Sequence, residues 1–238
     1  MKNIVKGGNQ MQKAGRIAII VAIIVAIGAL ISISLFTGQK STAEQVWDQQ
    51  TTIGSLEAKN HFVLYTDIMC PYCAVLGQTI IHNQDEFKQW LADNDVLWEV
   101  RITDYLYEGS DIDSSRPAAE SIYCAKNEGK FWDYYSAALE KLYQDYQSKG
   151  VAISKTSPQI KNLPDDYWYK IGQSVGLGES FKDCLDTHAT AEAVEDATAK
   201  TAKVVSGMPS VFYNGEEGAI DGTRGWDILK TYLKTGLK

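Results

Sequence analysis

The sequence predicts an α/β domain with a helical domain inserted between its two halves, preceded by one N-terminal transmembrane helix. Residues 17–36 are predominantly apolar and carry no charge. Strand-like segments occur at 61–66, 96–102 and 210–213, and the long stretch between the last two has helical periodicity. A small sheet domain interrupted by helices accounts for this order.

The composition is that of a globular protein with a sizeable core. The chain has 238 residues, of which 45% are hydrophobic and 22% charged. Its formal net charge of −7 argues against nucleic acid as a partner, because phosphate binding requires a basic face. The four cysteines permit three pairings, and their spacing alone does not choose among them (Cys70, Cys73, Cys124 and Cys184).

Residues 17–36 match a membrane-spanning helix in length, since about 20 residues cross the hydrocarbon core of a bilayer. Residues 1–16 carry four basic side chains and no acidic one, whereas Lys40 is the only basic residue close behind the segment. The positive-inside rule therefore predicts a cytoplasmic N-terminus at 1–16 and an extracytoplasmic C-terminal domain.

A cleaved signal peptide is the alternative for this segment. Its apolar region would span about 7–15 residues and end in a small-x-small site. The apolar run here is longer, residues 37–43 match such a site poorly, and no lipobox-type cysteine follows. We therefore expect an uncleaved, single-pass signal anchor in the cell membrane.

The segments after the anchor can be assigned in chain order. Residues 37–60 are polar and are expected to form a linker or a short leading helix. The periodicity predicts a buried strand at 61–66, a helix from Cys73 to about Leu91, and a core strand at 96–102. Residues 93–95 are expected to end that helix. Further helices are expected from 118 onward and at 130–146, 166–175, 180–187 and 189–204.

A β-hairpin and a final helix complete the pattern. Asn214-Gly215 is a strong turn signal between the strand at 210–213 and a partner near 218–220. An amphipathic helix is expected at 225–234. Residues 61–111 and 204–238 are thus assigned to the sheet domain and 112–203 to the helical insertion.

The Cys-Pro-Tyr-Cys motif at 70–73 could be half of a zinc site, a redox dithiol, a structural disulfide or a coincidence. Tetrahedral zinc usually requires a second closely spaced pair of ligands. Cys124 and Cys184 are far apart, and the three histidines lie singly (His61, His82 and His188). We therefore expect no metal and no cofactor.

The position of the motif favours the redox dithiol. If Cys70 is the N-cap of a helix, Pro71 falls at its first position, where a missing N–H costs nothing. The Cys70 thiol then faces the free N–H groups of the helix start, which favour its thiolate. Cys73, one turn later, is expected to be less exposed and to resolve a mixed disulfide.

At this point the chain resembles a known family. The segment Asp-Ile-Met-Cys-Pro-Tyr-Cys at 67–73 is similar to the active-site segment of DsbA-like thiol:disulfide oxidoreductases, particularly those of the Gram-positive type. The resemblance extends, in family order, to segments at 123–132, 181–186 and 205–215. It implies a thioredoxin fold with a helical domain inserted between its two halves.

The resemblance also implies roles for single residues. Pro209 would be the cis-proline facing the dithiol, with the backbone of Met208 presented to the substrate peptide beside Cys70. A second, structural disulfide would join Cys124 to Cys184; the alternative is two free buried thiols.

Three positions depart from the family pattern. Tyr72 stands where the best-known DsbA proteins have histidine, so a cationic group that stabilises the thiolate is missing. Leu64 occupies the position of the buried acid that many thioredoxin-fold proteins have, which leaves Asp67 as the nearest carboxylate. Asp67 is expected either to cap the helix, which we favour, or to relay a proton to Cys73. Met208 replaces the commoner threonine or valine.

The expected function is an enzyme that introduces disulfide bonds into exported proteins with free thiols. A membrane reoxidant of the DsbB or VKOR type would then regenerate its disulfide. The alternatives are a disulfide reductase or isomerase of the cell envelope and a non-catalytic thioredoxin-fold chaperone.

Overall fold

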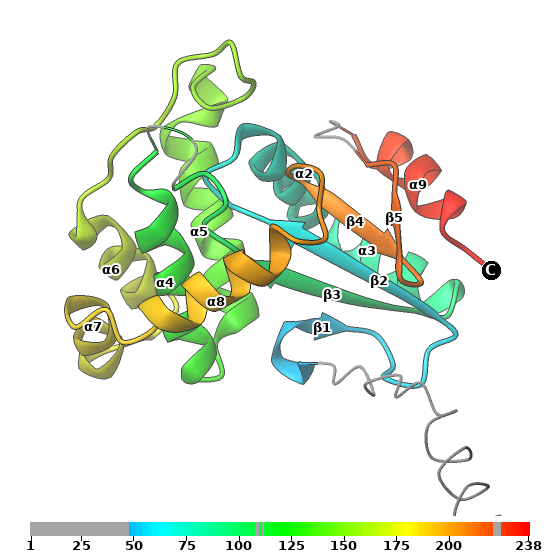
Figure 1. Cartoon of the computed structure of the whole chain (residues 1–238), viewed down its shortest axis with the longest axis horizontal. Coiled ribbons are helices and arrows are strands. Elements are labelled where there is room, and N and C mark those ends of the chain that lie inside the picture. The colour runs from blue at the N-terminus through cyan, green and yellow to red at the C-terminus, as the bar shows by residue number, and fades with distance from the viewer. Residues whose placement is uncertain (1–47, 108–109, 111, 221–224) are drawn as a thin grey trace, which may run out of the picture. The chain divides into compact units, whose positions relative to one another are not determined.

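A computed structural model of the chain describes residues 48–107, 110, 112–220 and 225–238. They contain a five-stranded sheet of order β1-β3-β2-β4-β5 (Figure 1). Strands β2 and β3 are parallel, and the other neighbours pair antiparallel. The strand bounds are Thr52–Ile53 (β1), Asn60–Thr66 (β2), Val96–Ile102 (β3), Ser210–Tyr213 (β4) and Glu216–Gly218 (β5).

The predicted cytoplasmic segment 1–16, the predicted anchor 17–36 and residues 37–47 lie outside the described residues. Among the helices that the structure does describe, none is long and apolar enough to cross a membrane.

One face of the sheet is packed by aromatic side chains. Alternation in β2 and β3 directs Phe62 and Trp98 to this face, and both side chains are fully buried. Phe87 packs edge-on against Trp98 and also contacts Trp226. Helices α3 (Gln84–Asp93) and α9 (Trp226–Thr235) thus lie against this face, and α2 (Pro71–His82) contacts both of them.

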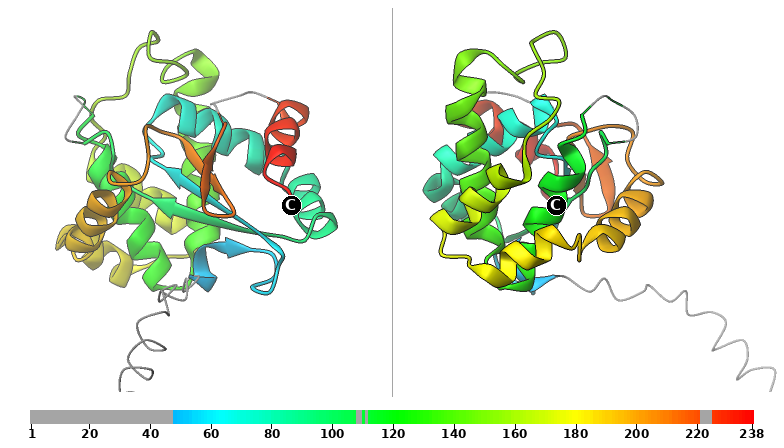
Figure 2. Two further views of the ribbon diagram at one scale, coloured as in Figure 1. Left: turned by 45° about the vertical axis from the view of Figure 1, so that its right-hand side comes forward. Right: turned by 90° about the vertical axis from the view of Figure 1, so that its left-hand side faces the viewer.

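The helical insertion lies between β3 and β4 in the chain. Figure 1 shows its helices gathered beyond the ends to which β2 and β3 point. The left view of Figure 2 has α9 on the opposite side of the sheet from α7 and α8. The insertion comprises α4 (Ser115–Asn127), α5 (Phe131–Asp145), α6 (Asp165–Ser174), α7 (Glu179–Asp186) and α8 (Ala191–Thr201), with a 3₁₀ turn η2 at Gln147–Lys149. The structure therefore has a thioredoxin-like α/β fold with a helical insertion.

Asp104, just after β3, forms hydrogen bonds with both ends of the insertion. Its carboxylate accepts hydrogen bonds from Arg116 at the start of α4 and from Thr198 in α8. Arg116 also pairs with Glu195 of α8 at 2.7 Å. The entry and the exit of the insertion are consequently held at one buried carboxylate.

The single helix expected to run to Leu91 is wrong. It begins at Pro71, as the Cys70 N-cap predicts, but it is broken at Asn83, where φ is −123° and ψ is 33°. The Asn83 side chain donates a hydrogen bond of 2.8 Å to the carbonyl of Thr79, and such local bonds compete with the helical ladder.

Two short segments of the sheet also differ from expectation. Residues 52–53, expected within a linker, form strand β1, which follows a 3₁₀ turn η1 at Gln49–Thr51 and pairs with Trp98 and Glu99 of β3. The partner strand expected near 218–220 lies at 216–218, because Asn214 and Gly215 form a tight two-residue turn with positive φ at both residues.

Candidate active site

Strand β2 and helix α2 position the two cysteines of the motif. Cys70 is the N-cap of α2, with extended φ and ψ of −71° and 125°, and Pro71 occupies the first turn. The Cys70 carbonyl accepts the first helical hydrogen bond, from the Ala74 N–H at 2.9 Å. The thiol of Cys70 therefore lies at the N–H end of the helix, as the motif predicts.

The pKa values of the two thiols are shifted in opposite directions. The pKa of Cys70 is lowered, chiefly by the hydrogen bond from the Cys73 thiol and also by the backbone N–H groups of Cys73 and Tyr72. The pKa of Cys73 is raised well above its ordinary value, first by burial and then by the adjacent Cys70. The pair thus favours a Cys70 thiolate next to a Cys73 thiol.

The loop between α8 and β4 faces the dithiol. Its Met208–Pro209 peptide bond is cis. The Met208 carbonyl oxygen lies 3.8 Å from the Sγ atom of Cys70. The backbone of Met208 therefore lies beside Cys70.

A cavity of about 540 Å³ opens beside Cys70. The motif contributes Cys70, Pro71 and Tyr72 to its wall. Sequence reasoning missed most of the other lining residues, because they come from separate loops and form no motif. The further residues are Tyr105, Leu106, Ser110, Ile112, Lys155, Gln159, Lys161, Ser206, Gly207 and Met208.

Asp67, three residues before Cys70, is almost fully buried. One carboxylate oxygen accepts a hydrogen bond from the Met69 N–H at 2.9 Å. The other accepts from the Leu106 N–H at 3.0 Å and from the Ser115 hydroxyl at 2.5 Å. Helix α2 has no side-chain cap, so the expectation that Asp67 caps this helix is wrong.

Burial raises the pKa of Asp67 from 3.8 to about 6, against the opposing effect of these three hydrogen bonds. The native state therefore holds a proton between pH 4 and 6 that the unfolded state has lost. The free energy of unfolding should fall by roughly 3 kcal/mol as the pH rises through this window. Urea unfolding at pH 4 and pH 7 should show that Asp67→Asn lacks this fall, and parallel pH dependences of the two proteins would contradict it.

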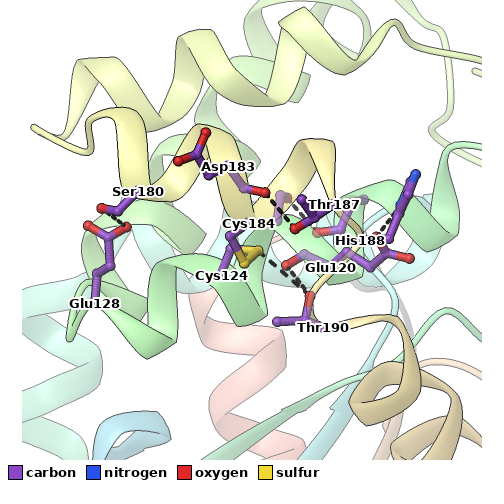
Figure 3. Close-up of a disulfide and its surroundings, with 11 residues drawn as sticks. Glu120, Cys124, Glu128, Ser180, Asp183, Cys184, Thr187, His188 and Thr190 are labelled. Atoms are coloured by element: carbon purple, nitrogen blue, oxygen red, sulfur yellow. Dashed lines mark hydrogen bonds and ion pairs between the residues drawn. A yellow bond between two sulfur atoms is a disulfide. The ribbon is translucent and has the colours of Figure 1, made fainter.

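Cys124 of α4 and Cys184 of α7 form a disulfide, with their Cα atoms 6.0 Å apart (Figure 3). The buried Thr190 hydroxyl lies 3.7 Å from the Cys124 sulfur. Nearby, His188 pairs with the buried Glu120 at 2.8 Å. This is the pairing that the family resemblance implied, and it joins two helices within the insertion.

Two other positions noted in the sequence have structural places in the fold. Leu64 is a buried core residue of β2, and His82 pairs with Glu140 at 2.9 Å on the surface. Within the part of the chain that the structure describes, no cluster of three or more histidine, cysteine and acidic side chains could hold a metal ion.

Known structures share this architecture. BdbD from Bacillus subtilis, in its oxidised form, superposes with a TM-score of 0.56 at 19% identity, covering 79% of this chain and 92% of that one. The thiol-disulfide oxidoreductase MdbA from Corynebacterium diphtheriae gives 0.54 at 18% identity, with coverages of 79% and 89%. The thiol-disulfide exchange protein alpha-DsbA2 from Wolbachia pipientis gives 0.53 at 16% identity, with coverages of 79% and 88%. At these identities the likeness establishes the fold.

None of the curated protein sequences matches this chain. A family model described as Thioredoxin matches residues 47–235. This match spans most of the chain and includes the dithiol, the helical insertion and the cis-proline loop. The chain therefore belongs to the thioredoxin family.

Proposed function

We propose that this protein is an extracytoplasmic thiol:disulfide oxidoreductase that introduces disulfide bonds into exported proteins through Cys70 and Cys73. The observation that carries this proposal is the pair of thiols at the start of α2, beside the cis peptide bond at Pro209. The pKa of Cys70 is lowered and that of Cys73 is raised. The similar structures whose names describe thiol–disulfide exchange support the same chemistry.

The proposed cycle starts from a Cys70–Cys73 disulfide. A client thiolate attacks the Cys70 sulfur, the bond between Cys70 and Cys73 breaks, and Cys73 leaves and takes up a proton. A second client thiolate then attacks the client sulfur of the mixed disulfide and releases Cys70 as its thiolate. Two electrons pass from the client to the enzyme, and a membrane disulfide carrier of the DsbB or VKOR type would remove them.

The pKa shifts of the two thiols favour transfer of the disulfide from the enzyme to the client. A stabilised Cys70 thiolate is a good leaving group, so release of the oxidised client is fast. The raised pKa of Cys73 keeps it protonated and slows its attack on the mixed disulfide, an attack that would return the client in reduced form. The second client thiol therefore has time to complete the transfer.

The amino-terminal sequence supports the proposed location. Residues 17–36 would anchor the protein, with the described domain outside the cytoplasm. The Cys124–Cys184 disulfide fits an oxidising compartment, where such bonds persist.

A reductase or isomerase is the second candidate, and one feature favours it. The charge of the buried Asp67 raises the pKa of Cys70, although by less than the Cys73 hydrogen bond lowers it. Tyr72 adds no cationic charge to offset Asp67. Both features would weaken the disulfide as an oxidant.

The reduction potential of the Cys70–Cys73 pair distinguishes the proposed oxidase from a reductase. Equilibration with glutathione buffers, read by thiol alkylation, should give a value less negative than about −180 mV, in the range of oxidases and isomerases. Oxidised protein should also form disulfides in a reduced substrate protein without another oxidant. A potential near the thioredoxin value of about −270 mV would contradict the oxidase and favour a reductase.

A further inference from the structure

Ser115, the first residue of α4, connects the helical insertion to the buried carboxylate of Asp67 by a hydrogen bond. Its hydroxyl donates to the Asp67 carboxylate at 2.5 Å, and neither residue is more than 1% exposed. The other two donors to Asp67 are backbone N–H groups, of Met69 and Leu106. Ser115 is thus the one side chain among these three donors.

The charge state of Asp67 depends on a close balance. Burial and, to a smaller extent, the charge of Asp104 raise its pKa, whereas the three hydrogen bonds lower it, and the net pKa is about 6. Asp104 is itself paired with Arg116. Because the pKa lies near neutrality, the loss of one donor is enough to change the charge at pH 7.

This charge acts on both thiols. After the larger effects of the Cys73 hydrogen bond and of burial, the Asp67 charge raises the pKa of Cys70. It also contributes to the raised pKa of Cys73. An ionised Asp67 therefore destabilises the Cys70 thiolate, and with it the reduced form of the enzyme.

We propose that Ser115 is a positioning residue that keeps Asp67 ionised against the dithiol and thereby limits the oxidising strength of the Cys70–Cys73 disulfide. The helical insertion would then tune the redox centre through one hydroxyl, in addition to lining the cavity. This inference rests on the proposed exchange function and deepens it.

Ser115→Ala tests the inference directly. Without the hydroxyl, Asp67 takes up a proton at neutral pH, the Cys70 thiolate gains stability, and the disulfide becomes a stronger oxidant. The equilibrium with glutathione at pH 7 should shift toward the reduced enzyme by about threefold to tenfold. The pKa of Cys70 in the reduced protein, followed by thiolate absorbance, should fall in parallel.

Ser121→Ala is the matched control. Ser121 lies in the same helix, is equally buried, and donates instead to the carbonyl of Ala118 at 2.7 Å. It should leave the glutathione equilibrium and the Cys70 titration unchanged. Equal shifts in both variants, or no shift in Ser115→Ala, would overturn the inference.

A double-mutant cycle separates the charge effect from a structural one. Asp67→Asn should also strengthen the oxidant, and adding Ser115→Ala to it should then have no further effect, because no charge remains to be controlled. Additive shifts would overturn the inference. If none of the proteins oxidises a client while the Ser115→Ala shift persists, the proposed function fails and the inference stands.

Discussion

Replacing Cys70 with serine is expected to abolish disulfide transfer to a reduced client, with a loss of more than about 10³-fold in rate. Serine matches the thiol in shape, so the fold should be retained, but it cannot form the mixed disulfide. The measurement is the recovery of activity of a reduced, unfolded substrate protein. Recovery at the wild-type rate would remove Cys70 from the chemistry and contradict the proposed function.

Cys73→Ser is the informative comparison for Cys70→Ser. Cys70 then remains as a nucleophile without its resolving partner, so it should accumulate as a mixed disulfide with small thiols or with clients. Non-reducing electrophoresis and mass spectrometry should locate the adduct on Cys70. Adducts at Cys73 of the Cys70→Ser variant would reverse the assignment of the two roles.

Removal of the Cys124–Cys184 disulfide is expected to cost about 4 kcal/mol in free energy of unfolding. The bond spans 60 residues, and closing a loop of that size restricts the unfolded chain by about this amount. Because small domains are stable by only about 5–15 kcal/mol, this is a large fraction. Urea unfolding of the double variant Cys124→Ala/Cys184→Ala, compared with wild type without reductant, measures it.

The double variant avoids a free thiol that could pair wrongly with Cys70. Its redox potential should equal that of wild type, because the bond joins α4 and α7 away from the dithiol. A loss of less than about 1 kcal/mol would show that the bond contributes little to the stability of the insertion.

The central strands of the sheet and the redox motif were predictable from local sequence. Strands β3 and β4 lie at the predicted residues, because runs of β-branched and aromatic side chains are unambiguous between turn signals. The start of α2 at Cys70 and Pro71 was predictable because proline has a φ suited to a helix and lacks the N–H that has no partner at the first helical position. These features depend on neighbours in the chain.

The surroundings of Asp67 could not be predicted in the same way. Its hydroxyl partner, Ser115, lies 48 residues along the chain, and one serine in a polar segment gives no signal. The break at Asn83 was missed because the apolar periodicity continues across it. Such features depend on tertiary contacts that periodicity does not encode.

The anchoring of the insertion at Asp104 has a consequence for how this protein can diverge. Since Arg116 and Thr198 bind the same carboxylate, the chain between them leaves and returns at one place beside the sheet. Insertions and deletions in the connections between α4 and α8 would leave the geometry of the dithiol unchanged. We therefore expect length variation among homologues to concentrate in the connections between these helices, and Asp104 with its two partners to be retained together.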